Sequence, residues 1–372
     1  MKSLHFSFFN TVNVPLTFCR VYEQMGHYSR LLTVYKHRGN IEEDICLNKK
    51  IFNPWWLKRI RNKREIEAET IIHQKALEGN IHFYKPSSKL EEFILKIRDN
   101  FRNIEFKKLA RKYDLFEFDI YHFHGGIDFF RDSRWVKKLN KMGKPIICHY
   151  HGPDIRSRGI VKDIDEISCL NLTSEYDLLS LHPNLKYLPI PFDCSNLPQK
   201  TIGGDKIRII HSPSNPQRKG THIIEAVLQK VSKARNIEYL IITGASRQKV
   251  IEEKMRSHIA IDQIGNFGGT GYGVNSLETL AMQIPTITEF TKEYAEFLKG
   301  HPFILADKNT LYDVLIYLID NEEYRKKMGI LGRQWVLEHH SYKSVWNTMT
   351  NYMESTIPAV YKRLKQESIV KE

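Results

Sequence analysis

The chain of 372 residues has few cysteines and no long apolar run, and these two absences limit the classes of protein to which it can belong. Its five cysteines are widely spread and none belongs to a C-x-x-C pair. This argues against a disulfide framework or a cysteine-rich zinc site, and for a reducing compartment. No apolar run reaches the roughly 18 to 20 residues that span a bilayer. The first residues also lack the apolar core and cleavage site of a signal peptide, so we expect a cytoplasmic protein.

Acidic residues are scarce relative to basic ones: 43 Asp and Glu stand against 56 Lys and Arg, for a net charge of +13. Such a chain should be attracted to polyanions, either nucleic acid or an anionic membrane surface, and composition does not choose between them. We expect no specific nucleic-acid partner.

The basic residues are dense between Lys49 and Arg64, where seven of sixteen residues are basic and none is acidic. Trp55 and Trp56 stand in the middle of this segment. Tryptophan beside Lys and Arg suits the interface of an anionic membrane. The alternatives are a surface helix whose tryptophans pack on the domain and, more weakly, stacking on RNA.

Strand and helix patterns alternate twice along the chain, and a polar segment rich in Gly and Pro separates the two series near residues 194–206. This alternation predicts an α/β protein with two Rossmann-like domains. We expect an N-terminal domain over residues 1–195, a second domain over 196–342, and a C-terminal helix over 343–372 that crosses back to the first domain. The strands expected from apolar runs cover residues 3–9, 30–36, 119–124, 145–150, 168–172, 185–188, 207–211, 237–243 and 259–264. The helices expected cover 16–25, two or three segments within 65–114, 132–142, 221–233, 247–256 and a final one near 343–365.

Two of the predicted strands end in histidine followed by glycine. His124 and Gly125 close one strand, and His151 follows the next strand and leads to Asp154. Open α/β sheets bind ligands at the carboxyl ends of their strands. Histidines there can orient a substrate, hydrogen-bond a phosphate or transfer a proton, although a histidine in a strand can equally be structural.

The stretch from Asp262 to Pro285 joins a strand end, a glycine-rich turn and an amphipathic helix that carries Glu278. Free backbone N–H groups and the dipole of a helix N-terminus favour phosphate. A carboxylate about one turn further on can accept hydrogen bonds from sugar hydroxyls. The stretch therefore predicts a site for a nucleotide sugar, although it contains no strict G-x-G-x-x-G and such loops are common in α/β proteins.

Further motifs carry a family resemblance. They run from His211 to Asn215 (HSPSN), then through Lys219-Gly220-Thr221, and from Asp262-Gln263 through Tyr272-Gly273 to Glu278, Met282 and Pro285; the first half adds YHFHGG, HYHGPDIR and LPIPFD. Over roughly residues 115 to 350 the chain resembles the retaining glycosyltransferases of family 4. The resemblance implies the GT-B fold, in which two Rossmann-like domains face each other across a cleft.

The resemblance also implies roles for individual residues. Glu278 matches a glutamate that holds the nucleotide ribose, Lys219 a lysine on the donor diphosphate, and His151 a histidine beside the transferred sugar; these three form the implied catalytic set. The donor side further takes in Ser214, Arg218, Gly220, Thr270, Gly273, Val274 and Asn275. The acceptor side takes in Asn13, His124, Gly125 and Asp154.

The sequence departs from the family pattern at two donor positions. Thr270 stands where the first glutamate of the family's pair belongs. The arginine that usually precedes the lysine is missing, because its position falls in the segment around Ser214. We expect Arg218, next to Lys219, to substitute for that arginine.

The resemblance implies a retaining glycosyltransferase that takes an NDP-sugar as co-substrate. No DxD-type acidic pair stands at a suitable strand end, so we expect no metal and no cofactor. The basic surface suggests a lipid-linked or envelope glycan as acceptor, with the enzyme peripheral at the inner face of the membrane. The alternatives are a GT-B sugar-nucleotide epimerase and a non-catalytic protein that binds sugar nucleotides or polyanions.

Overall fold

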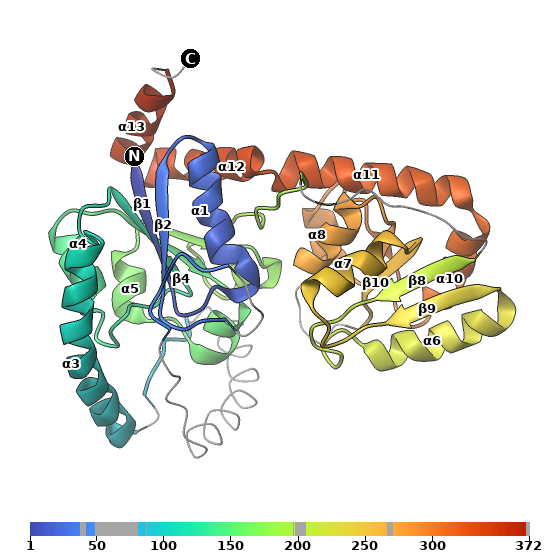
Figure 1. Ribbon diagram of the computed structural model, residues 1–372, viewed down its shortest axis with the longest axis horizontal. Helices are drawn as coiled ribbons and strands as arrows, with labels where there is room; N and C mark the ends of the chain where they lie inside the picture. The colour runs from blue at the N-terminus through green and yellow to red at the C-terminus, as the bar shows by residue number, and fades with distance from the viewer. Residues whose placement is uncertain are drawn as a thin grey trace. The chain divides into compact units, whose positions relative to one another are not determined.

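A computed structural model gives the structure of the chain (Figure 1). It describes residues 1–37, 42–48, 81–86, 88–195, 197, 206–265 and 271–369. The segment between Lys49 and Arg64, and Thr270, lie outside these described residues. The chain forms two compact units: unit 1 comprises Met1–Pro191 and Val345–Glu372, and unit 2 comprises Phe192–Ser344.

Unit 1 is built on a seven-stranded sheet in which every paired strand is parallel to its neighbour. In spatial order the strands are β3 (Ile45–Cys46), β2 (Tyr28–Thr33), β1 (Lys2–Ser7), β4 (Ile120–His124), β5 (Ile146–Tyr150), β6 (Leu170–Thr173) and β7 (Leu185–Tyr187). The central strands β4 and β5 are buried along their whole length, because helices cover both faces of a parallel sheet.

Helices from both ends of the chain cover one face of this sheet. Tyr22 of α1 (Val14–Gln24) packs its ring against Trp346 of α12 (Tyr342–Thr356), with the ring centres 5.0 Å apart. On the opposite face, Trp135 of α4 (Arg134–Lys141) packs on Phe6 of β1, and Phe106 of α3 (Lys89–Lys112) packs on Trp135. Figure 1 shows α1 on one side of the strands and α3 and α4 on the other. The short helix α5 (Lys162–Ile167) joins the second group through buried Ile164.

The C-terminal segment differs from the single helix expected near residues 343–365. It forms two helices, α12 and α13 (Pro358–Ile369), which meet at Ile357. Proline lacks the N–H that would continue α12, and its fixed φ suits the first turn of a new helix. Within 65–114, the described residues form one helix, α3, where two or three were expected.

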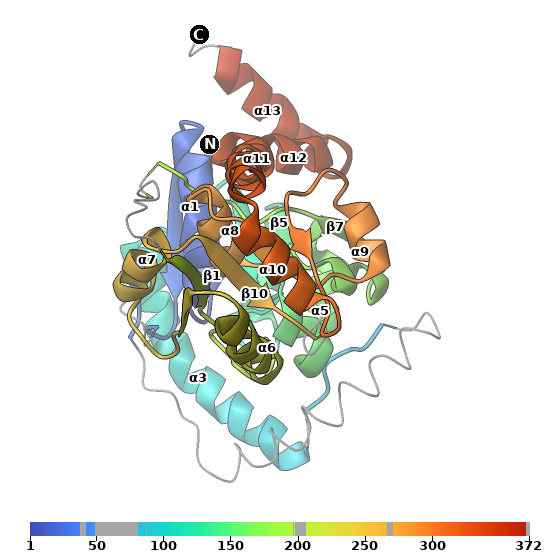
Figure 2. The same cartoon turned by 90° about the vertical axis from the view of Figure 1, so that its right-hand side faces the viewer.

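Unit 2 contains a five-stranded parallel sheet. Its spatial order is β12 (Ile304–Leu305), β11 (Thr286–Thr288), β10 (Ile259–Gln263), β8 (Ile207–His211) and β9 (Ile237–Ile241). Apolar residues of α6 (Thr221–Ala234) and α10 (Leu311–Asp320) bury one face, while residues from α7 (Arg247–Met255) and the end of α8 (Val274–Ala281) pack on the other. Figure 2 shows α7 and α8 on one side of β10 and α6 on the other. The two parallel sheets confirm the predicted α/β class.

The long helix α11 (Glu322–His340) packs on α8 through two glycines. A Cβ atom on Gly329 would lie 2.3 Å from the carbonyl oxygen of Gln283, whereas one on Gly332 would lie 3.0 Å from the end of the Leu280 side chain. A backbone carbonyl cannot move aside as a side chain can. Gly329 therefore sets how closely α11 approaches α8. The short helix α9 (Lys292–Phe297) completes this unit's described helices.

We predict that Gly329→Ala destabilises the protein. Overpacking costs about 1–3 kcal/mol of stability, which is more than the roughly 0.5–1 kcal/mol of stability gained when alanine replaces glycine inside a helix. Thermal unfolding of the full chain measures the effect. Gly332→Ala is the matched control and should be nearly neutral. Equal melting temperatures for the two variants would contradict this role of Gly329.

Candidate functional site

The sequence-predicted residues of unit 1 gather where β4 and β5 end. The backbone N–H of His151 donates to Asp154 Oδ2 at 2.9 Å, and Arg158 Nη1 donates to Asp154 Oδ1 at 3.2 Å. Gly125 has φ of +84°, and a Cβ there would lie 3.2 Å from Asp154 Oδ1. The Arg158 guanidinium also donates to the carbonyl of Gly125. The structure therefore brings His124, Gly125, His151 and Asp154 together.

Asn13 lies at the start of α1 rather than within that network. Its own φ is +62°, and Asn10 Nδ2 donates to Asn13 Oδ1 at 2.8 Å. Asn tolerates the left-handed conformation better than most residues. Asn13 thus closes the turn after β1, which also ends at the carboxyl edge of the sheet.

Sequence reasoning missed the residues that fix the loop after β5. Arg156 Nη2 donates to Glu175 Oε2 and to Asp177 Oδ1, both at 2.6 Å. Glu175 Oε1 in turn accepts from the backbone N–H of Gly152 at 2.6 Å. The charges anchor the turn that carries His151. The only sign of this role in the sequence is that Arg156 closes the HYHGPDIR motif.

Behind the same edge, five histidines line one face of the sheet: His5, His122, His124, His149 and His151. Burial lowers the pKa of His5 to about 3. It lowers the pKa values of His122, His124 and His149 well below the usual value, with smaller contributions from neighbouring histidines. These four imidazoles are neutral near pH 7. The sequence prediction named His124 and His151 only, yet the H-x-H spacing in each strand could have revealed His122 and His149, because alternate residues share a face.

In unit 2 the predicted Lys219 lies in the turn between β8 and α6. Its Nζ donates to Asp262 Oδ2 at 2.8 Å and to Gln263 Oε1 at 2.9 Å, and its side chain is 18% exposed. Gly220 follows at the N-terminal end of α6 with φ of +65°. The ammonium therefore lies at the carboxyl end of β10.

Asp262 connects Lys219 to the start of α8. Its Oδ1 accepts from Asn275 Nδ2 at 2.9 Å, and Asn275 Oδ1 accepts from Ser212 Oγ at 2.8 Å. Burial by itself would raise the pKa of Asp262, but Lys219 and the hydrogen-bond donors around it hold the pKa below the usual value. The sequence motif included Asp262 without giving it a role. The structure makes it the centre of this network.

His211 of the same motif has a structural role. Its Nδ1 donates to the carbonyl of Ile261 at 2.8 Å, and its Nε2 accepts from Thr221 Oγ1 at 2.9 Å. Burial lowers the pKa of this imidazole. His211 thus joins β8 to β10 and to the start of α6, and it aligns the turn that carries Lys219.

Glu278 lies further along α8 and is paired with two cations. Its Oε2 accepts from Lys254 Nζ at 2.6 Å, and its Oε1 accepts from Arg247 Nε at 3.0 Å. Lys254 is fully buried, whereas the Arg247 side chain is 71% exposed. Burial lowers the pKa of the Lys254 ammonium, although Glu278 opposes that change. Neither cation was recognised from the sequence, because a lysine in a charged helix gives no sign of burial.

The remaining predicted donor residues lie around the two turns. Ser214 and Arg218 are exposed in the loop between β8 and α6. Gly273 and Val274 form the N-terminus of α8. The backbone N–H of Leu277 donates to the carbonyl of Gly273 in this first turn. The structure joins Lys219 and Asn275 through Asp262, with Gly273 and Val274 adjacent.

No family model matches the chain, and no curated protein does. Among solved structures, it resembles an α,α-trehalose-phosphate synthase (UDP-forming) from Burkholderia vietnamiensis, with a TM-score of 0.56, 11% identity, and 95% of this chain and 100% of that chain covered. It resembles HepE of Anabaena, solved in complex with UDP, with a TM-score of 0.52, 9% identity, and 95% and 100% covered.

The chain spans about half the length of TarM from S. aureus, which it matches with a TM-score of 0.44 and 14% identity over 63% of this chain and 54% of that one. At these identities the likeness to the trehalose-phosphate synthase and to HepE establishes the fold alone. The chain has the α/β fold with parallel sheets of the GT-B glycosyltransferases. Among the described residues, no helix is both long enough and apolar enough to cross a bilayer.

The pairing of Glu278 with Lys254 yields a prediction about stability. Glu278→Gln should destabilise the protein by about 3–5 kcal/mol, because it leaves the buried ammonium without its anion. Lys254→Met should cost less, since Arg247 remains beside the carboxylate. Urea unfolding of the full chain measures both changes.

The double variant Lys254→Met/Glu278→Leu is the control, because replacing both charges by apolar groups is often close to neutral. If the double variant were as unstable as the two single changes added together, the pair would not be coupled as the structure shows.

Proposed function

We propose that the chain is a glycosyltransferase that moves a sugar from a nucleoside-diphosphate sugar to an acceptor. The observation that carries the proposal is the position of Lys219, a cation at the carboxyl edge of a parallel sheet beside the N-terminus of α8. Ligands of open α/β sheets bind at that edge. A diphosphate needs positive charge and N–H donors there.

Unit 2 is the donor side in this proposal. The Lys219 ammonium has three N–H donors, and the structure shows acceptors for two of them. The described residues show no acceptor for the third, which we propose donates to a phosphate oxygen, together with the backbone N–H groups of Gly273, Val274 and Asn275. Ser214, Arg218, Gly220 and Thr270 complete the proposed donor contacts. UDP is the first nucleotide to test, because HepE was solved with UDP and the trehalose-phosphate synthase is described as UDP-forming.

Glu278 is proposed to accept hydrogen bonds from the ribose. Its Oε2 stays with buried Lys254, which fixes the carboxylate in place. Its Oε1 contacts Arg247, whose mostly exposed side chain can swing into solvent. Binding would then replace one exposed ion pair, which is worth little, and would leave the buried pair intact.

The proposed reaction breaks the bond between the sugar and the diphosphate as positive charge develops on the sugar. Lys219 and the start of α8 stabilise the departing diphosphate, a role that donors aimed at developing charge can fill without a metal ion. Retention of configuration and membership of family 4 belong to this proposal through the resemblance of the motifs.

Unit 1 is the acceptor side in this proposal. His151 lies beside the transferred sugar, while His124, Gly125, Asp154 and Asn13 shape the acceptor edge. The geometry that supports this is the Asp154 network, which fixes both loops at once. A fixed edge keeps the acceptor oriented for attack.

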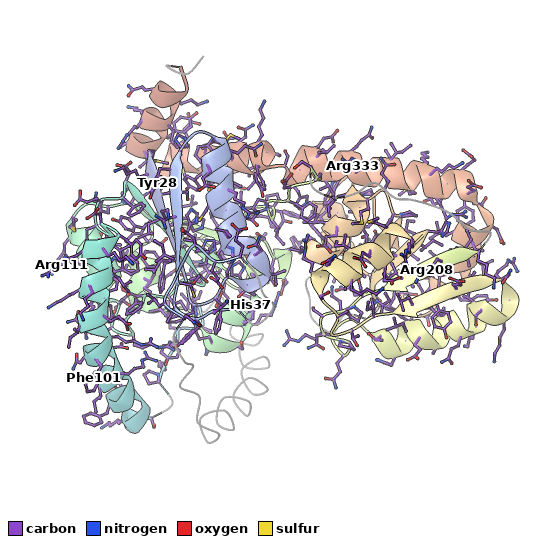
Figure 3. All side chains as sticks on the ribbon, in the orientation of Figure 1. Tyr28, His37, Phe101, Arg111, Arg208 and Arg333 are labelled. Atoms are coloured by element: carbon purple, nitrogen blue, oxygen red, sulfur yellow. The ribbon has the colours of Figure 1, made fainter. Side chains whose placement is uncertain are left out.

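We further propose an acceptor presented at an anionic membrane. On α3, four large apolar side chains are between 42% and 75% exposed: Phe93, Ile97, Phe101 and Ile104. Their spacing of four, four and three residues places them on one stripe of the helix. Figure 3 shows Phe101 and Arg111 projecting outward from α3. Exposed lysines and arginines on the same helix suit anionic headgroups, and they are Lys96, Lys107, Lys108, Arg111 and Lys112.

For the donor site, we predict that UDP raises the melting temperature of the full chain. A ligand at 100 times its Kd stabilises the folded state by about 2.7 kcal/mol. Lys219→Met should remove most of the shift and lower the rate of transfer by about 10²–10³. Thermal shift with UDP, GDP and ADP measures binding.

Lys230→Met is the matched control, because Lys230 is exposed on α6, and its response to UDP should equal that of the wild type. Wild-type protein that responds to none of these nucleotides would overturn the donor assignment. UDP released only when acceptor is present separates transfer from epimerisation, which needs no acceptor.

For the membrane surface, we predict that vesicles containing phosphatidylglycerol retain the protein at low salt and release it as salt rises. Phe101→Asp should weaken retention about tenfold or more, since burying an aromatic side chain contributes about 1.5–3 kcal/mol. Vesicle sedimentation measures this. Ile330→Asp, at a position 50% exposed on α11 in unit 2, is the control. Equal loss in both variants, or no retention of the wild type, would contradict the α3 surface.

A further inference from the structure

Four histidines of unit 1 form a row across three neighbouring strands. His5 of β1 is in register with His122 of β4, and His124 of β4 is in register with His149 of β5. In-register residues of adjacent strands point to the same face, and so do alternate residues of one strand. The imidazoles of this row therefore lie on the same face of the sheet, beneath α1.

Three of these imidazoles have the spacing of metal ligands. One ring nitrogen each from His5, His122 and His124 lies within 4.8 Å of the others. His5 Nδ1 and His124 Nε2 are 3.2 Å apart. Tetrahedral zinc, with Zn–N bonds of about 2.0–2.1 Å, holds its ligand nitrogens about 3.3 Å apart. The pair His5 Nδ1 and His124 Nε2, which also share a hydrogen bond, already has that spacing, and the widest separation in the cluster exceeds it by about 1.5 Å.

The buried nitrogens of this cluster that lack a partner among the described residues are both nitrogens of His122 and, on His5 and His124, the ring nitrogens opposite their mutual hydrogen bond. His5 and His122 are 0% exposed, and His124 is 2% exposed. Neither nitrogen of His122 has a hydrogen-bond partner among the described residues, and the same holds for His5 Nε2 and His124 Nδ1. Buried polar atoms are nearly always satisfied, so such a group calls for an ion or an ordered water.

The surroundings suit a closed site. Phe18 of α1 lies over His122 and His124, with ring centres 5.5 Å and 5.7 Å apart, and Tyr22 lies edge-on to His5 at 5.2 Å. The His122 and His124 rings stack 4.5 Å apart. The described candidate cluster contains imidazoles and no carboxylate. Nitrogen ligands favour zinc and its neighbours in the first transition row over magnesium or calcium.

We propose that His5, His122 and His124 bind one transition-metal ion, with zinc as the natural occupant. The ion would join β1 to β4 behind the loop that carries Gly125. This proposal differs from the expectation, drawn from the sequence, that the chain binds no metal. It does not alter the proposed metal-independent departure of the diphosphate, because that step uses Lys219 and the start of α8 rather than these histidines. The inference does not rest on the proposed function.

Metal analysis of the purified full chain tests the site. After removal of bound metal with a chelator and dialysis against zinc chloride, we expect about one equivalent of zinc per chain and a higher melting temperature than in the metal-free protein. Cobalt chloride should give the visible absorption bands of tetrahedral cobalt bound by nitrogen. Less than a tenth of an equivalent of zinc, with no cobalt bands, would overturn the proposal.

His122→Leu removes one ligand and both unpartnered nitrogens while keeping an apolar side chain in place. It should lose the bound zinc, the cobalt bands and the thermal response to zinc. His222→Leu is the matched control for surface binding, since His222 is exposed on α6 of unit 2, and it should retain all three. If His122→Leu folded, kept its zinc and melted higher than the wild type, the cluster would be ordinary core packing. Should His122→Leu fail to fold, the cobalt spectrum of the wild type decides the question.

Discussion

Asp262 is buried at the end of β10, and its negative charge is stable there only because donors reach it from two sides. Lys219 reaches it from the turn before α6, and Asn275 reaches it from the first turn of α8. Removing a charge from water is costly unless the partners are already in place. The network therefore fixes the turn before α6 and the start of α8 relative to each other. Every proposed contact to the diphosphate depends on that.

The cost of burying a charge also determines the state of other buried side chains, which avoid that cost in different ways. Lys254 is fully buried and is balanced by Glu278. In the row formed by His5, His122, His124 and His149 of unit 1, burial keeps the imidazoles neutral instead. A neutral imidazole carries one lone pair, which is what a metal ion requires. The Lys254–Glu278 pair of unit 2 and the neutral histidine row of unit 1 thus have the same cause: a buried charge must be either paired or neutralised.

The sequence predicted the fold class because its signals are local. Apolar runs bounded by glycine and proline place most strands of both sheets within a few residues, and the histidine-glycine endings locate the edge of unit 1. The two-residue strands β3 and β12 were not expected. The break at Pro358 was missed because the apolar pattern continues through it, although proline cannot extend the helix before it.

By itself the sequence determined the alternation of strands and helices and the loops that carry Lys219, His151 and Asp154, since periodicity and punctuation act over short distances. Only the tertiary structure decided what those side chains contact. Lys254 lies beside Glu278, 24 positions away, and His5 lies beside His124, 119 positions away. Such contacts depend on burial and on the register of strands that are distant in sequence. The partner of each buried charge is therefore a property of the fold rather than of any local pattern.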